Sequence, residues 1–313
     1  MTRPTALFAA LLLLALPLSL LAGRVWLGPD TPNAMLIVAE LRLPRALLAV
    51  AIGAGLAAAG AAMQGYLRNP LADPGLFGVA PAAALGAVTS LLLGLPAWLP
   101  LLALLGAGAA MALLALLAGR AGGVALFTLA GMMIASLAGS LTSLAISLAP
   151  NAFTLEGIMA WLMGALTDRS WPDLWIAAPC ALAGIALLRA AGPGLDALTL
   201  GPDAARSLGV DPARLRWLLV LGTGLAVGGG VAVAGIVGFV GLIVPHLVRP
   251  LTDGRPSSLI VPSALAGALL MLLADCLCRV LPLVSELRLG IALSLLGAPF
   301  FLWLLLRMRR GLA

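Results

Sequence analysis

The sequence predicts an all-α polytopic membrane protein, and three observations carry this prediction. Of the 313 residues, 62% are hydrophobic and only 10% are charged. The mean hydropathy of +1.14 lies far outside the range of soluble globular domains. Charge-free apolar runs recur along the chain, and most are long enough to cross the hydrocarbon core of a bilayer. We therefore expect one transmembrane domain over residues 1–313, with about ten spans.

The N-terminal half supplies the first five spans. Segment 4–23 resembles a signal peptide, but it is long enough to span and lacks a clean cleavage site, so we expect a retained helix. Residues 24–45 should form a polar connection, and 46–67 the second span. The charge-free stretch between positions 73 and 120 predicts two spans that break at a Pro-rich turn. A fifth span fits 121–149.

The C-terminal half begins with an exception, because the apolar segment 157–167 is too short to cross and indicates a re-entrant or interfacial helix. Residues 174–188 predict the sixth span. Segment 217–248 carries no charge and many glycines, which favours a seventh span, a tight turn and the start of an eighth. Residues 256–274 and 289–306 predict the last two spans.

The longest polar passage is 201–216, which carries three arginines and two aspartates and must therefore face water. Pro202 suits a helix start and Gly209 a helix end, while Asp211 and Pro212 indicate a second start. We expect two short helices that are joined at a glycine, within about 199–216, along one membrane face. An ordinary surface loop is the alternative.

Arginine alone tests sidedness, because the chain contains no lysine. A cytoplasmic N-terminus places 12 arginines inside and 6 outside, which satisfies the positive-inside rule. The outer six are Arg24, Arg42, Arg45, Arg169, Arg279 and Arg288. Both termini and segment 201–216 are thus expected in the cytoplasm.

Several function classes are disfavoured. Without lysine the chain cannot form a G-x-x-x-x-G-K-[ST] phosphate loop, so nucleotide energy must come from a partner. The basic charge is spread between apolar runs, which argues for topology signals and against nucleic acid. One histidine, three scattered cysteines and no clustered carboxylates give little basis for an enzyme, a metal site or a cofactor.

Glycine-rich pairs such as Gly222 and Gly224 lack the strand that a dinucleotide site requires, so close helix packing is the favoured interpretation. That interpretation covers Gly224 with Gly228 and the series Gly131, Ala135, Gly139. His246 is expected to have a hydrogen-bonded structural role near the start or a bend of the eighth span.

Asp275 precedes Arg279 by four residues, so the two can pair on one helix face. A structural pair is the favoured interpretation. The alternative is an ion-coupled secondary transporter that uses Asp275, because an intramembrane carboxylate is a functional candidate. Arg42 and Arg45 flank Pro44 on the expected outer face, where guanidinium groups could bind an acidic partner or simply anchor at lipid phosphates.

Six motifs occur in order and give the chain a family resemblance. They are Arg42-Leu-Pro-Arg45, Met63-Gln64 with Arg68-Asn-Pro-Leu-Ala-Asp-Pro-Gly75, Leu200-Gly201 to Leu208-Gly209, Gly238-Phe-Val-Gly-Leu-Ile-Val-Pro-His246 with Arg249, Leu273-Ala-Asp275 with Arg279, and Gly297-Ala-Pro-Phe300. Together they resemble the FecCD-like permease subunits of ABC importers for iron-siderophore, haem and cobalamin. The resemblance covers nearly the whole chain.

The resemblance implies a type II ABC importer permease in the bacterial inner membrane that pairs with a second permease subunit, which we expect to be an identical chain. Two cytoplasmic ABC ATPase subunits would dock on the short helices, and a periplasmic substrate-binding protein on the outer face.

The resemblance also assigns residues. Arg42 and Arg45 match the docking arginines, with Arg288 as the expected further contact and Arg279 as its alternative. Asn69, Leu71 and Gln64 match the gate or pathway. The ATPase-coupling positions are Gly201, Asp203, Ala205, Arg206, Leu208 and Gly209.

Two departures from the family pattern matter. Pro202 stands where a glutamate is common, although Asp203 can supply the charge, and Asp253-Gly-Arg255 replaces an expected Asp-His-Arg.

Overall fold

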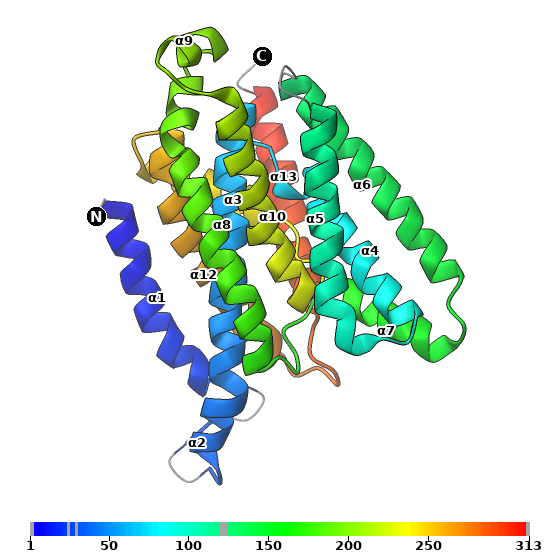
Figure 1. The fold of residues 1–313 in the computed structure, drawn as a ribbon. Helices are drawn as coiled ribbons and strands as arrows, with labels where there is room; N and C mark the ends of the chain where they lie inside the picture. Colours follow the sequence, from blue (N-terminus) through cyan, green and yellow to red (C-terminus); the bar gives the residue numbers. More distant parts are fainter. Residues whose placement is uncertain (1–2, 24–25, 29–30, 119–123, 311–313) are drawn as a thin grey trace.

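The computed structural model describes residues 3–23, 26–28, 31–118 and 124–310, and these ranges form a helical bundle without a strand (Figure 1). Eight described helices are long and apolar enough to cross a membrane. They are α1 (Arg3–Leu21), α3 (Leu43–Leu67), α5 (Leu99–Ala118), α6 (Val124–Ser147), α8 (Trp171–Leu198), α10 (Pro212–Ala234), α12 (Pro256–Val280) and α13 (Leu289–Arg310).

Shorter helices complete the bundle. They are α2 (Ala34–Leu36), α4 (Val79–Leu92), α7 (Ala152–Leu162), α9 (Pro202–Ser207) and α11 (Val240–Val248). Each of the ten expected spans corresponds to one helix, and α4 and α11 are the two that fall short of a full crossing. The segment that was expected to be too short to cross forms α7, although it begins five residues earlier than predicted.

The centre of the bundle is α3, which packs against α8, α10, α11 and α12. Its closest approaches are backbone to backbone: a Cβ on Gly60 would overlap the Gly241 carbonyl of α11, and a Cβ on Gly53 would overlap the Gly267 carbonyl of α12. Helix association in a bilayer relies on such close packing, because lipid is as apolar as leucine. In contrast, α1 lies at the periphery and is mostly exposed.

The glycine prediction is confirmed on α10. A Cβ on Gly224 would lie 2.7 Å from Met111 Cγ, and one on Gly228 would lie 2.8 Å from Ala107 Cβ. Both glycines therefore allow α5 to pack closely against α10. The prediction is wrong within this chain for Gly139, where a Cβ would meet nothing within 4 Å. Gly139 lies on an open face of α6.

The predicted polar connection 24–45 is wrong in its second half. A continuous helical segment runs over Ala34–Leu67, through the π-helical turn η1 (Ile37–Arg42). Pro44 does not end this helix, because it lies at the first positions of α3, where the wide π-turn precedes it and a backbone N–H is dispensable. Arg42 and Arg45 are therefore helical residues.

The predicted pair of short helices is also wrong, because only α9 is short. The second start is real, since Asp211 Oδ1 accepts a hydrogen bond from Ala213 N at 2.8 Å, but the helix that begins at Pro212 continues as the long helix α10. The sixth and ninth spans likewise extend beyond their predicted ends, to Leu198 and Val280. Apolar faces on both helices continue past the first charged residue, so the charge did not stop them.

Two ends of the bundle can be distinguished. Helix α9 and the C-terminal end of α13 lie at one end, and α2 lies at the opposite end (Figure 1). We call them the α9 end and the α2 end. Arg24 and Arg120, which entered the count of inside and outside charges, lie outside the described residues.

Candidate functional site

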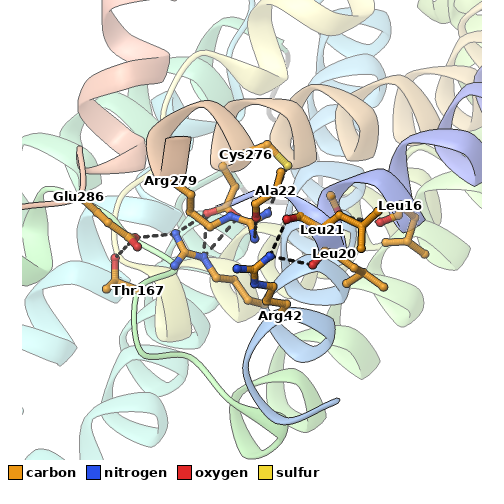
Figure 2. Close-up of polar contacts among 12 residues, drawn as sticks. Leu16, Leu20, Leu21, Ala22, Arg42, Thr167, Cys276, Arg279 and Glu286 are labelled. Atoms are coloured by element: carbon orange, nitrogen blue, oxygen red, sulfur yellow. Dashed lines mark hydrogen bonds and ion pairs between the residues drawn. The ribbon is translucent and has the colours of Figure 1, made fainter. Parts of the chain in front are cut away.

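A buried ionic network lies at the α2 end, where α1, α3 and α12 meet the loop 281–288 (Figure 2). The Arg45 guanidinium donates from Nε and Nη2 to Asp275 Oδ1, at 3.0 and 2.8 Å, and from Nη2 to Glu286 Oε2 at 2.8 Å. The Arg45 side chain is 12% exposed and Asp275 only 1%. One guanidinium thus joins α3 to α12 and to the loop that follows α12.

Arg279 lies on the other side of Asp275, with its Nε 3.1 Å from Asp275 Oδ2 as an ion pair without hydrogen-bond geometry. The four-residue spacing in α12 places the two side chains together, which confirms the predicted pair. Arg279 Nη1 also donates to the Ala22 carbonyl at 3.1 Å. Because Asp275 is enclosed by two guanidinium groups, removing it would leave two buried cations facing each other.

Arg42 secures the end of α1. Its Nη1 donates to the carbonyls of Leu20 and Leu21, at 2.9 and 2.8 Å (Figure 2). The last carbonyls of a helix have no partner within that helix, and they carry the negative end of the helix dipole. Arg42 and Arg279 therefore both act as C-terminal caps for α1, although they come from different helices.

Glu286 links the network to the loop after α7, because Thr167 Oγ1 donates to Glu286 Oε2 at 3.3 Å (Figure 2). Burial alone would raise the pKa of Glu286, but its hydrogen bond to Arg45 and the charges of Arg45 and Arg279 outweigh burial and lower the pKa. Glu286 is thus held ionised by the arginine that it anchors.

The three predicted docking arginines lie at the α2 end but in different settings. Arg45 is engaged inside the chain, and Arg42 is half-buried against α1. Arg288, also half-buried, lines a cavity of about 290 Å³ together with Trp161, Asp168 and Arg169. No ion pair reaches Arg288 within the part of the chain that the structure describes. Docking by all three stays a prediction.

The predicted coupling residues form α9 and its two ends. Gly201 and Gly209 have φ angles of +104° and +84°, which only glycine adopts without strain, so they bound the helix sharply. Ala205 is buried, whereas Leu208 is 64% exposed. Asp203 and Arg206 pair at 3.5 Å on the solvent side. The helix therefore presents an apolar and a charged contact at the tip of the bundle.

The predicted gate residues divide into two groups. Asn69 is exposed and Leu71 half-buried, in the turn after α3, where Asn69 Oδ1 accepts from Leu71 N at 3.0 Å. Gln64 is enclosed at 2% exposure: its Nε2 contacts the Leu242 carbonyl at 3.3 Å, and its Oε1 accepts from Arg249 Nη2 at 2.9 Å. In this structure Gln64 ties α3 to α11, and it does not line an open passage.

Sequence reasoning missed Glu286 and Thr167 as members of the network. Neither lies in a motif: Thr167 ends the short apolar segment 157–167, and Arg45, the partner of Glu286, is 241 residues from it. It also assigned His246 a hydrogen bond, but Nδ1 is enclosed and has no partner among the described residues. Instead the ring packs edge-on against Phe300, with centroids 5.9 Å apart.

A helical bundle with apolar spans, a short polar helix at one end and a buried ionic network at the other is the architecture of a polytopic membrane transport subunit. The model of the FecCD transport family matches residues 6–307, and the chain belongs to this family. It has the type II ABC importer permease architecture.

Named relatives agree. The chain is 39% identical over 312 residues to the vitamin B12 import system permease protein BtuC of Escherichia coli O9:H4 (strain HS), covering 96% of this chain and 94% of the relative. It is 40% identical over 309 residues to BtuC of Salmonella typhi, with the same coverage. A solved metal-chelate type ABC transporter in an inward-facing conformation matches with a TM-score of 0.90 and 33% identity, over 97% of this chain and 98% of that one.

Proposed function

We propose that this permease imports cobalamin or an iron complex, a siderophore or haem chelate, across the bacterial inner membrane. The observation that carries the proposal is the family match over residues 6–307, which includes both α9 and the ionic network. The names of the relatives favour cobalamin, and the name of the structural match allows other metal chelates. The chain supplies the passage, and its partners supply energy and cargo.

Two ABC ATPase subunits dock at α9 in this proposal. An exposed leucine and an exposed ion pair at the tip of the bundle suit a protein partner, because burying the leucine removes apolar surface from water and the charged pair contributes little to the chain's own stability. When ATP binding closes the ATPases, α9 moves with them and the spans rock between two arrangements.

A periplasmic substrate-binding protein docks at the α2 end. Arg42 and Arg288 are half-exposed and are proposed to meet partner carboxylates, whereas Arg45 contributes mainly by holding Asp275 and Glu286 in place. With this orientation both termini lie in the cytoplasm, which agrees with the excess of inside arginines.

A second permease chain packs against the open face of α6. Exposed leucines need no explanation in lipid, but Gly139, Ser140 and Ser143 are also exposed there. Small residues let helix backbones approach closely. Because these small residues share one face of α6 that the other described residues leave exposed, they support a homodimer.

The alternative, a secondary transporter driven through Asp275, is less well supported. Both carboxylate oxygens of Asp275 face arginines, and the side chain is 1% exposed. A coupling ion would have to displace Arg45 or Arg279. The group is better suited to a structural role.

Reconstitution tests the proposal. Liposomes that contain this chain, a cognate ATPase and its binding protein should accumulate radiolabelled cobalamin when ATP is present, with ferric siderophore and haem as parallel cargoes. The matched control is the same complex with a hydrolysis-deficient ATPase. Concentrative uptake by the chain without any ATPase would contradict the proposal.

A further inference from the structure

The motif Val244-Pro-His-Leu-Val-Arg249 has no part in docking or coupling, yet it ends in a cluster of basic side chains. Arg249 follows α11 directly, and the loop after it leads to Ser257, whose N donates to Asp196 Oδ1 at 2.8 Å near the end of α8. Arg307 lies near the end of α13, at the same α9 end of the bundle (Figure 1).

Arg249 is half-buried and only partly satisfied. One nitrogen, Nη2, donates to Gln64 Oε1 at 2.9 Å, whereas Nε is enclosed and has no acceptor among the described residues. Gln64 is neutral, so it orients the guanidinium without balancing the charge. A half-buried cation without a counter-charge is costly, and an anion that binds there would offset this cost.

Aromatic rings connect His246 to Arg307. The His246 ring packs on Phe300, the Phe300 and Trp303 centroids are 5.8 Å apart, and Arg307 Cζ lies 5.4 Å over the Trp303 ring. Arg249 follows His246 by three residues, and Phe300, Trp303 and Arg307 share one face of α13 at helical spacing, so both arginines lie on the side where α11 packs against α13. The three basic side chains therefore form one cluster between α11 and α13.

No carboxylate of the described residues pairs with this cluster. The described aspartates at and near the α9 end are bonded elsewhere: Asp203 to Arg206, Asp211 to Ala213, Asp196 to Ser257, Asp253 to Ser258 and Arg255, and Asp73 to Gly75. The cluster thus carries two permanent positive charges, those of Arg249 and Arg307. Because Arg307 is exposed, an anion can reach the cluster from the surface.

We infer that Arg249, Arg307 and His246 form a binding site for a phosphate group. Guanidinium groups match the geometry of phosphate oxygens, and paired arginines on neighbouring helices can hold one phosphate between them. An anionic phospholipid headgroup is the favoured source, because the half-exposed Trp303 and the exposed Leu302 and Leu306 continue the site toward lipid. A soluble phosphate, either free or on a cargo such as cobalamin, has the same chemistry.

Lipid retention tests this site. The full chain is purified, stripped of lipid, and titrated with phosphatidylglycerol or phosphatidylcholine while bound lipid is counted by native mass spectrometry. Arg249→Gln and Arg307→Gln should each weaken phosphatidylglycerol binding about tenfold, the usual effect of losing one charge-assisted hydrogen bond, and leave phosphatidylcholine unchanged. Arg249→Lys should retain most of the preference because it keeps the charge.

The matched control is Arg214→Gln, since Arg214 is an exposed arginine near α9 outside the cluster, and it should bind phosphatidylglycerol like the parent. Arg307 is exposed, so its variant keeps the test valid if Arg249→Gln fails to fold. Displacement of bound lipid by inorganic phosphate or cobalamin would support the site with a soluble source. Equal retention of the two lipids by the parent, or full retention in both Gln variants, would overturn the inference.

Discussion

The guanidinium of Arg45 lies 2.8 Å from Asp275 and 2.8 Å from Glu286, two carboxylates that the chain brings to it from more than 200 residues away. This arrangement changes what Arg45 can do. A docking arginine needs free donors, and most of those on Arg45 are already used. The first prediction therefore separates Arg45 from its neighbour Arg42.

Arg42→Ala should weaken binding of the periplasmic protein and cost about 1 kcal/mol of stability for the lost cap of α1. Arg45→Ala should destabilise the permease by about 3 kcal/mol, because it leaves Asp275 with one buried partner fewer. Thermal unfolding and binding-protein affinity, measured on both variants in the same detergent, check this. The assignment fails if Arg42→Ala docks like the parent.

Asp275→Asn should destabilise the protein by about 3–5 kcal/mol, since Arg279 then loses its ion-pair partner and Arg45 keeps only Glu286. The matched control is Asp203→Asn on α9, whose exposed pair should contribute less than about 1 kcal/mol. Chemical denaturation of both variants measures the difference. Similar denaturation midpoints for Asp275→Asn and Asp203→Asn would show that the ionic network does not stabilise the fold.

Acid should loosen the α2 end through Glu286. Because Arg45 and its neighbours lower the pKa of Glu286 below the unfolded value of 4.5, the stabilisation is complete above that pH and is lost as the pH falls through the folded pKa. Glu286→Gln should flatten this acid dependence. Thermal melts of parent and variant from pH 7 down to about pH 3 test the sign. If the unfolding temperatures of the parent and of Glu286→Gln fall in parallel with pH, Glu286 is not the source of the acid dependence.

Gly60→Ala should destabilise the bundle by about 1–3 kcal/mol or more, because a methyl group there would overlap the Gly241 carbonyl and separate α3 from α11. Gly108→Ala provides the control: Gly108 lies on an exposed face of α5 with nothing within 4 Å, so alanine should be neutral or slightly stabilising. Unfolding temperatures of the purified variants decide between these outcomes.

Leu208→Asp on α9 should uncouple the transporter without unfolding it, since Leu208 is 64% exposed and contributes little to the core. In the assembled complex, ATP hydrolysis should no longer respond to cargo. Leu208→Met, which keeps an apolar side chain at the same position, is the control and should leave the response intact. A normal response in Leu208→Asp would count against ATPase docking at α9.

Much of this fold follows from local pattern, and its failures have physical causes. Apolar run lengths located every helix that could span, and the spacing of Asp275 and Arg279 predicted their pair. The predicted boundary failed at Pro44, because a proline in the first turn of a helix is compatible with either a start or a continuation. At Pro212 the predicted start was correct, but the helix continues to Ala234. Arg45 was predicted to bind a partner protein or lipid phosphates, because no local sequence pattern indicates an internal partner 230 residues away.

The glycine contacts of α3 have a consequence for how the sequence can vary. At Gly53 and Gly60 there is no room for even one more carbon atom, so random substitution along this helix should be tolerated least. The open face of α6 around Gly139 should tolerate bulk in the isolated chain and reject it once two copies associate. A survey of viable substitutions would then outline the assembly without a structure of it.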